Sequence, residues 1–187
     1  LVNGLGPEAA VANLVLRKPL ALKIVGDLAW ELATLRGWTK DSFEEFQIRR
    51  YGYRMEMLKV IRTWSIRRAD TVIYNSRYMA SCLGDLGVPE KRKRIVFNTP
   101  GDVNSIAPVQ VPLGTSVILT TVSRLVPWKE VDQLIRTIAE MEDVGLVIIG
   151  DGPEMTSLRE LSKRLCASRF IYFAGRKDRL DALSMSR

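Results

Sequence analysis

Short runs of apolar residues alternate along the chain with longer segments in which apolar residues recur every three or four positions. Continuous apolar runs of this length predict buried strands, and the three-to-four spacing predicts helices. Six runs predict strands: 20–25, 71–74, 94–97, 117–122, 145–149 and 170–173. Helices are predicted between them: 7–16, 41–68, from 76 to about 84, 128–141, 153–165 and from 178 onward. This alternation, with strands apolar on both faces, predicts parallel sheets covered by helices.

The predicted helix 41–68 carries two patterns at once. Its apolar residues recur at helical spacing: Phe43, Phe46, Tyr53, Met57, Ile61 and Trp64. From residue 49 onward it is strongly basic, with Glu56 as the only acid among seven cations: Arg49, Arg50, Arg54, Lys59, Arg62, Arg67 and Arg68. The basic residues are read as the solvated face of a helix packed on the core. The alternative is a basic amphipathic helix that contacts an anionic membrane or a lipid-phosphate acceptor.

A stretch rich in proline, glycine and asparagine, residues 98–114, interrupts the pattern and predicts a linker. We place the linker at 105–115, between a first domain at 1–104 and a second at 116–187. The expected fold class is α/β, with two Rossmann-like parallel-sheet domains.

Composition narrows the possible chemistry. The 187 residues contain 28 Lys and Arg against 21 Asp and Glu, a net charge of +7, and no histidine. Histidine-ligated metals and Ser-His-Asp triads are therefore excluded. Two distant cysteines, Cys82 and Cys166, favour a reducing cytoplasm over a disulfide framework. The longest uncharged run, 103–123, contains two prolines and a glycine and does not predict a membrane span.

Three loops that follow predicted strands of the second half carry candidate chemistry. In the first, residues 121–129, Arg124 and Lys129 flank a predicted helix start, where amides and the helix dipole favour an anion. The same two residues could equally be surface cations beside an ordinary turn. The second loop, 150–154, reads Gly-Asp-Gly-Pro-Glu, which is also ordinary helix-capping chemistry. The third, 173–177, contains a glycine that could admit a flat ligand or simply form a turn.

Successive parallel strands end at one edge of a sheet, which is where open α/β folds bind ligands. We therefore expect the three loops to lie together. Their residues, V-S-R-L-x-P-x-K, I-G-D-G-P-E and F-x-G-R, resemble the donor domain of family 4 glycosyltransferases of the GT-B fold. Residues 23–31, 69–78 and 94–98 resemble the acceptor domain of the same family.

The resemblance implies a retaining enzyme that transfers a hexose-type sugar from a nucleotide diphosphate sugar to a hydroxyl of a glycan or lipid-linked acceptor. It implies that Arg124 and Lys129 hold the donor diphosphate and stabilise its growing charge. It assigns the remaining site residues as follows: Gly150, Asp151, Gly152 and Glu154 beside the nucleoside, Gly175 and Arg176 at the base, and Gly26 and Asp27 on the acceptor side. Neither a metal nor another cofactor is expected, and no Asp-x-Asp triplet occurs.

The resemblance also implies an internal fragment. The family's glycine-rich loop would precede residue 1 and its Glu-x7-Glu element would follow residue 187, so we expect both domains to be incomplete and the fragment to be a poor enzyme alone. Gly26 and Asp27 stand where many members have a histidine. A cytoplasmic location is expected, at the inner face of the membrane if the basic segment contacts lipid.

The alternative function is a noncatalytic basic α/β module that binds nucleotide or nucleic acid. It is suggested by the net charge and by the basic cluster at 91–94. No helix-turn-helix, RNA-recognition aromatic pair or zinc spacing accompanies that cluster, so a nucleic-acid partner is not expected.

Overall fold

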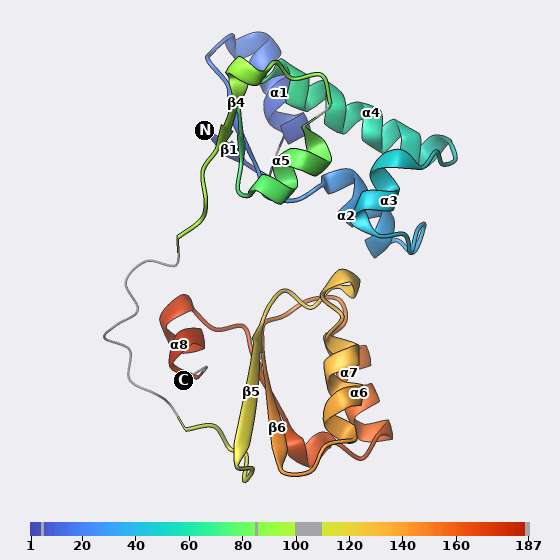
Figure 1. Ribbon diagram of the computed structural model, residues 1–187, viewed down its shortest axis with the longest axis vertical. Coiled ribbons are helices and arrows are strands. Elements are labelled where there is room, and N and C mark those ends of the chain that lie inside the picture. Colours follow the sequence, from blue (N-terminus) through green and yellow to red (C-terminus); the bar gives the residue numbers. More distant parts are fainter. Residues whose placement is uncertain (5, 85, 100–109, 186–187) are drawn as a thin grey trace. The chain divides into compact units, whose positions relative to one another are not determined.

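The computed structural model describes residues 1–4, 6–84, 86–99 and 110–185, and the chain forms two compact units, 1–99 and 100–187 (Figure 1). Each unit is an α/β structure built on a parallel sheet. The expected boundary between residues 104 and 105, and positions 105–109 of the expected linker, lie outside the described residues.

The first unit contains a four-stranded parallel sheet whose strand order follows the sequence. Its strands are β1 (Val2–Asn3), β2 (Ala21–Ile24), β3 (Thr71–Tyr74) and β4 (Lys93–Ile95). Its helices are α1 (Gly6–Leu16), α2 (Leu28–Leu35), α3 (Phe43–Ile48), α4 (Tyr53–Arg68) and α5 (Arg77–Leu83). The three strands predicted for this half are confirmed, whereas β1 was too short to show an apolar run.

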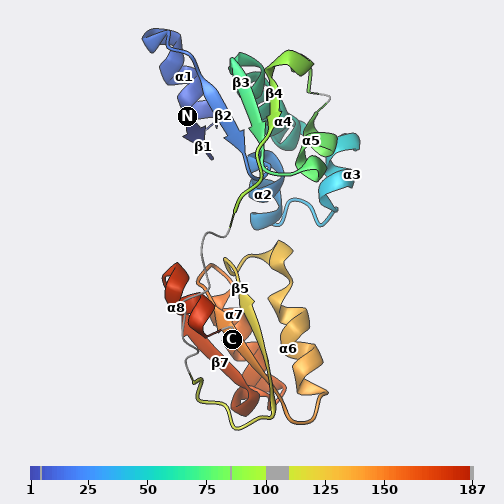
Figure 2. The same ribbon diagram turned by 60° about the vertical axis from the view of Figure 1, so that its left-hand side comes forward.

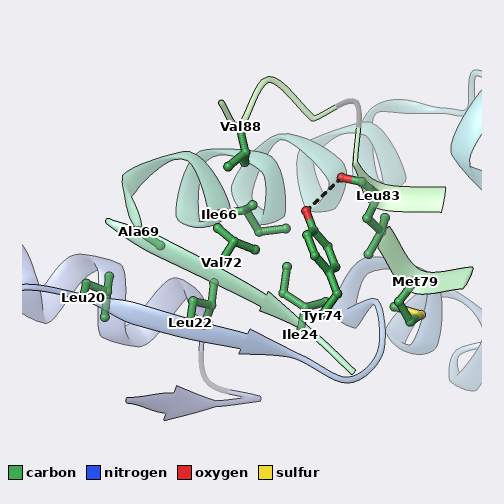
Figure 3. Close-up of a cluster of buried hydrophobic side chains, with 10 residues drawn as sticks. All are labelled: Leu20, Leu22, Ile24, Ile66, Ala69, Val72, Tyr74, Met79, Leu83 and Val88. Atoms are coloured by element: carbon green, nitrogen blue, oxygen red, sulfur yellow. Dashed lines mark hydrogen bonds between the residues drawn. The ribbon is translucent and has the colours of Figure 1, made fainter. Parts of the chain in front are cut away.

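The core of the first unit lies between β2, β3 and the helices α4 and α5 (Figure 3). Leu22, Ile24, Val72 and Tyr74 alternate along the two strands with residues that are only partly buried. Ser76 caps α5, because its hydroxyl accepts a hydrogen bond from the Met79 amide at 3.1 Å. These contacts fix the strand ends from which the loops of this unit emerge.

The prediction of one helix over 41–68 is wrong, because the chain forms two helices separated by a non-helical segment at 49–52. A capping box between Ser42 and Glu45 starts α3. Helix α3 ends at Arg49, which is extended, and Gly52 is the extended N-cap of α4. Between them, Arg49 and the Tyr51 hydroxyl both donate hydrogen bonds to Asp41, which turns the chain back before α4 begins.

Asp41 should make the stability of the first unit depend on pH in the acidic range. Its pKa lies below the ordinary 3.8 because the Tyr51 hydroxyl, and then the Arg49 guanidinium, hydrogen-bond to its carboxylate. A carboxylate with a depressed pKa stabilises the fold above its unfolded pKa and loses this effect as the pH falls through the folded value. Asp41→Asn should therefore be less stable than the parent at pH 7. Urea unfolding between pH 7 and 2.5 should show this difference shrinking below pH 3.8, and a constant difference would contradict the assignment.

The second unit contains a three-stranded parallel sheet in the order β5-β6-β7. Its strands are β5 (Val117–Val122), β6 (Val144–Ile149) and β7 (Ile171–Gly175), and its helices are α6 (Val131–Ala139), α7 (Met155–Arg164) and α8 (Arg179–Ser184). Helices α6 and α7 cover one face of the sheet, and α8 lies on the other (Figure 2). All three predicted strands of this half are confirmed.

Strand β6 is buried on both faces, as its uninterrupted apolar sequence predicts. Leu146 and Ile148 pack with α6 and α7, whereas Val147 and Ile149 pack on the α8 side. The predicted linker ends at residue 115, yet its Val111 and Leu113 pack against the cluster formed by Val147 and Ile149 on the α8 side of the sheet. The described end of the linker is therefore part of the packing of the second unit.

Candidate functional site

The three strands of the second unit end side by side. Val122 pairs with Ile149, and Ile149 pairs with Gly175, so the last residues of β5, β6 and β7 lie in one row. The loops that follow these strands therefore start from the same edge of the sheet. This confirms the expectation, drawn from the order of the strands, that the three loops lie together.

A cavity of about 590 Å³ lies at this edge. Its lining comes from all three strand ends and loops: Val122, Ser123, Arg124, Ile149, Gly150, Asp151, Gly152, Arg176 and Lys177. Three of these side chains are cations and only one is a carboxylate. The arrangement therefore favours an anionic ligand, and arginine in particular presents the fork geometry that matches phosphate oxygens.

Two glycines let the loop backbones approach closely. A Cβ atom on Gly150 would lie 1.8 Å from the carbonyl oxygen of Ser123, and one on Gly152 would lie 2.2 Å from that of Leu125. Gly150 also has a φ of +144°, which other residues rarely adopt. The Gly150 amide donates a 2.8 Å hydrogen bond to the carbonyl of Gly175. Close backbone packing, rather than capping alone, thus requires both glycines.

Further backbone hydrogen bonds join the loop after β5 to the loop after β6. The Leu125 amide donates to the carbonyl of Asp151 at 2.9 Å, and the Glu154 amide donates to the carbonyl of Leu125 at 3.2 Å. The Asp151 carboxylate accepts from the Gly152 amide at 2.7 Å, which holds that side chain within its own loop. The wall of the cavity is therefore fixed by main-chain contacts before any ligand binds.

Two polar residues of the lining were not among the predicted site residues. Ser123 places a hydroxyl oxygen that is buried and has no hydrogen-bond partner. Buried polar groups are almost always paired, so an orphaned hydroxyl in a cavity wall is a candidate ligand contact. Lys177 adds the third cation. Both lie in loops that the sequence analysis singled out, 121–129 and 173–177, next to the predicted Arg124 and Arg176.

Lys129, predicted beside Arg124, is exposed but does not line the cavity. The helix expected over 128–141 instead begins at Val131. Residues 127–129 form a 3-10 turn, and Glu130 adopts a left-handed conformation with a φ of 50° between the two elements. The amide of Lys129 donates to the carbonyl of Val126 within that turn, so it does not point freely at the sheet edge.

Glu154 and Gly175 are the other two predicted residues outside the lining. Burial, and then the nearby charge of Asp132, raises the pKa of Glu154 above its ordinary value. Gly175 ends β7, and its carbonyl is occupied by the amide of Gly150. The remaining predicted residues of this unit, Arg124, Gly150, Asp151, Gly152 and Arg176, are brought together around the cavity.

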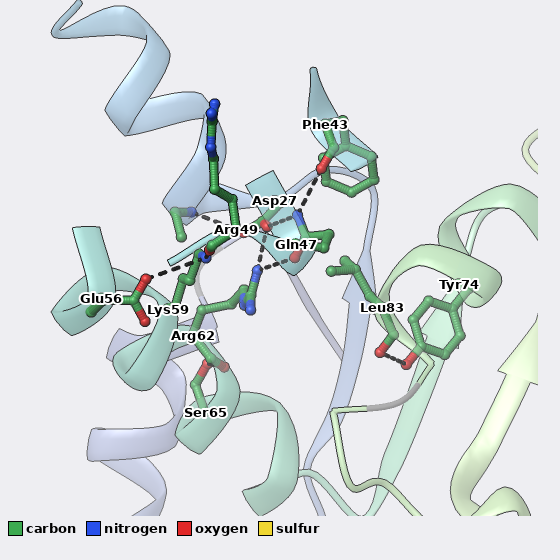
Figure 4. Close-up of polar contacts among 11 residues, drawn as sticks. Asp27, Phe43, Gln47, Arg49, Glu56, Lys59, Arg62, Ser65, Tyr74 and Leu83 are labelled. Carbon is green, nitrogen blue, oxygen red and sulfur yellow. Dashed lines mark hydrogen bonds and ion pairs between the residues drawn. The ribbon is translucent and has the colours of Figure 1, made fainter. Parts of the chain in front are cut away.

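In the first unit, Asp27 is the centre of a buried polar cluster (Figure 4). Its carboxylate caps α2 by accepting from the Ala29 amide at 3.0 Å, accepts from the Gln47 amide group at 2.9 Å, and forms an ion pair with Arg62. Arg62 also donates to the Gln47 side-chain oxygen at 2.8 Å. The carboxylate has no exposed surface, so Asp27 supports the loop after β2 and is not presented to a ligand.

Gly26, the neighbouring predicted residue, does line a cavity. This small cavity of about 120 Å³ lies where β2 and the start of α1 meet α4. Glu31, Arg62 and Ser65 add polar groups to a lining that is otherwise mostly apolar. The loop at Gly26 thus forms part of a cavity wall and is anchored by the buried Asp27.

Within 1–4, 6–84, 86–99 and 110–185, no group of three or more His, Cys, Asp or Glu side chains is arranged to hold a metal ion. None of the helices in these ranges is long and apolar enough to cross a membrane.

The family model and the two curated proteins to which this chain is similar are all described as glycosyltransferases. Residues 104–186 match the family model described as glycosyl transferases group 1. The chain is 29% identical over 115 residues to the lipopolysaccharide core biosynthesis glycosyltransferase LpsE of Rhizobium meliloti, covering 60% of this chain and 34% of that protein. It is 32% identical over 133 residues to a GDP-mannose-dependent phosphatidylinositol monomannoside mannosyltransferase of Mycolicibacterium smegmatis, covering 63% and 35%.

The fold is shared with a solved structure over nearly the whole chain. The crystal structure of Anabaena HepE in complex with UDP and glucose superposes with a TM-score of 0.67 at 19% identity, over 95% of this chain and 47% of that one. The chain spans about a third of the length of the two curated relatives and about half that of the solved protein. The predicted α/β fold with two parallel sheets is confirmed.

Proposed function

We propose that this chain, whose residues 104–186 match the family model of the group 1 glycosyl transferases and whose fold is that of GT-B proteins, forms part of a retaining glycosyltransferase. The enzyme transfers a hexose-type sugar from a nucleotide diphosphate sugar to an acceptor hydroxyl, in glycan or glycolipid biosynthesis. The second unit binds the donor, and the first unit faces the acceptor.

The observation that carries this proposal is the cationic cavity at the strand ends of the second unit. Three cations and one carboxylate surround about 590 Å³, enough space for part of a nucleotide diphosphate. This unit as a whole has equal numbers of basic and acidic residues, 11 of each in 100–187. The local excess of positive charge is therefore a property of the cavity and not of the whole surface.

In the proposed reaction, the bond between the anomeric carbon and the diphosphate oxygen breaks, and a bond from the acceptor oxygen forms with retained configuration. The acceptor proton is released, and negative charge grows on the leaving diphosphate. In the proposal, Arg124 stabilises that charge directly and the Ser123 hydroxyl donates to a phosphate oxygen. Lys129, which lies outside the cavity lining, is kept as the second cation. The loop residues Gly150, Asp151, Gly152 and Glu154 lie beside the nucleoside, and Gly175 and Arg176 contact the base.

The acceptor side of the proposal rests on the loop at Gly26, which is held by the buried Asp27 below it. A glycan or lipid-linked acceptor is supported by the relatives, one of which is described as acting in lipopolysaccharide core synthesis and another on a phosphatidylinositol monomannoside. We retain the cytoplasmic location as part of the proposal, since Cys82 and Cys166 are both free thiols.

Arg124→Gln should weaken nucleotide binding about tenfold to a hundredfold, because a hydrogen bond to a charged partner contributes about 1.5–3 kcal/mol. Ser123→Ala should weaken it only a fewfold, since it removes one hydroxyl. Calorimetric titration of the chain with UDP and with GDP measures both effects. Arg164→Gln is the matched control, because Arg164 is an exposed arginine at the end of α7 that does not line the cavity.

The same titration separates this proposal from the nucleic-acid alternative. A nucleotide that binds to the parent and to Arg164→Gln, but weakly to Arg124→Gln, supports the donor site. Equal binding to all three proteins contradicts it. Tighter binding to random duplex DNA, falling steeply as salt is raised, would instead favour a noncatalytic polyanion-binding module.

A further inference from the structure

The charged side chains around the cavity of the second unit have no charged partners of their own. Arg124, Arg176 and Lys177 supply the cations, and Asp151 supplies the carboxylate. Over the part of the chain that the structure describes, none of these four side chains forms an ion pair. The Asp151 carboxylate uses one oxygen to accept from the Gly152 amide, at 2.7 Å. Its second oxygen and the three cations are therefore available to a ligand.

The order of the strands divides these charges between two ends of the cavity. Strand β6 lies between β5 and β7, so Asp151 emerges at the centre, Arg124 on one side and Arg176 on the other. Neighbouring strands are about 4.8 Å apart, which separates the ends of the two outer strands by about 10 Å. One end of the cavity thus offers a cation, and the other offers a cation beside a carboxylate.

The Asp151 and Arg176 loops are also tied together through their backbones. The amide of Gly150, next to Asp151, donates a 2.8 Å hydrogen bond to the carbonyl of Gly175, next to Arg176. The forked donor of Arg176 and the acceptor oxygen of Asp151 are therefore carried by two loops that are fixed to each other. Such a pair can read a flat ligand that presents acceptors and donors on adjoining edges.

Guanine is the common base that fits this pair best. Its O6 and N7 atoms accept two hydrogen bonds from one arginine, and its N1 and exocyclic amino groups can donate both to one carboxylate. Uracil presents only one acceptor beside one donor, so it makes two of these four hydrogen bonds. Adenine and cytosine place an amino donor where the arginine requires an acceptor.

We propose that the sugar donor of this protein is a guanosine diphosphate sugar, and that Arg176 and Asp151 select its base. Arg176 donates to O6 and N7, and Asp151 accepts from N1 and the exocyclic amino group. Arg124, at the opposite end of the cavity, is left for the diphosphate. Lys177 lacks the fork of arginine and does not distinguish the bases. The inference rests on the proposed function, since it names the nucleotide of the same donor site.

Calorimetric titration of the chain with GDP, UDP, ADP and CDP tests the choice of base. GDP should bind the parent at least about tenfold more tightly than UDP, because it makes two further hydrogen bonds to charged side chains. ADP and CDP should bind more weakly still. Arg176→Met, which removes the fork, should weaken GDP binding about tenfold and UDP binding only a fewfold. The matched control is Arg164→Met at the end of α7, outside the cavity lining, and it should keep the preference of the parent.

Two analogues of GDP test the two contacts separately. 7-Deaza-GDP lacks the N7 acceptor, and inosine diphosphate lacks the exocyclic amino group, so each should bind the parent several-fold more weakly than GDP. Arg176→Met should bind GDP and 7-deaza-GDP equally. Asp151→Asn keeps an oxygen for the Gly152 amide but replaces the free oxygen with a donor, so it should bind GDP and inosine diphosphate equally. Retained binding of UDP by both variants shows that the cavity is intact.

The possible failures are distinguishable. If UDP binds the parent as tightly as GDP does, the guanine assignment is wrong, whereas the donor site stands because a nucleoside diphosphate still binds. If the analogues lose the same affinity in the variants as in the parent, Arg176 and Asp151 do not read the base. If no nucleoside diphosphate binds at all, the proposed function fails and the guanine assignment fails with it.

Discussion

Arg62→Ala is expected to destabilise the first unit by about 3–5 kcal/mol, the usual cost of removing one partner of a buried ion pair. The substitution leaves the fully buried Asp27 carboxylate without its cation. It also removes the contacts that hold three helices together, because Asp27 caps α2, Gln47 belongs to α3 and Arg62 belongs to α4. We therefore expect the loop at Gly26 to lose its fixed position together with the helix packing.

Urea unfolding followed by circular dichroism measures this effect, with the two units fitted as separate transitions because the chain is not a single cooperative domain. The matched control is Arg49→Ala, which breaks a 3.0 Å ion pair between Arg49 and Asp41 that is open to solvent. Exposed pairs of that kind contribute about 0–1 kcal/mol. Equal losses for the two variants would show that the buried cluster does not hold the unit together.

Gly150→Ala is expected to abolish nucleotide binding by the second unit. The new Cβ atom would lie 1.8 Å from the Ser123 carbonyl oxygen, and the backbone φ of +144° is strained for alanine. The loops after β5 and β6 must separate to admit it, which breaks the cavity wall and moves Ser123 and Arg124. The strain alone costs about 1–3 kcal/mol.

Titration with the nucleoside diphosphate that binds the parent, together with thermal unfolding, measures both consequences. Gly114→Ala is the control, since Gly114 is exposed and nothing lies within 4 Å of a Cβ built on it. A Gly150→Ala protein that binds nucleotide as well as the Gly114→Ala protein does would contradict the close approach of the two loops.

The strands were predictable because each is a continuous apolar run, and the grouping of Arg124, Gly150 and Arg176 followed from parallel strand ends. The direction of individual side chains was not predictable in this way. The start of α6 depends on the left-handed conformation of Glu130, which local residue preferences do not predict. Lys129 therefore lies outside the cavity lining, although its distance from Arg124 along the chain suggested otherwise.

Helix α4 buries Arg62 and exposes Tyr53 and Trp64, so the predicted solvated basic face is wrong at Arg62. The cause is tertiary. A helix with apolar residues on one side normally buries that side. Here the buried partner of Arg62 is Asp27, which lies 35 positions earlier in the chain, so nothing within the helix reveals it. Ser123 escaped notice for a similar reason, because an unpaired hydroxyl is visible only when its surroundings are known.

The most direct test of the donor site is a calorimetric comparison of nucleotide affinities on the parent chain and on Arg124→Gln. It compares UDP with UMP, and GDP with GMP. If the cations of the second unit hold a diphosphate, one nucleoside diphosphate should bind the parent at least about tenfold more tightly than its monophosphate. That preference should disappear in Arg124→Gln. Failure of every nucleotide to bind, or equal affinity for diphosphate and monophosphate, would contradict a nucleotide-sugar site at this edge of the sheet.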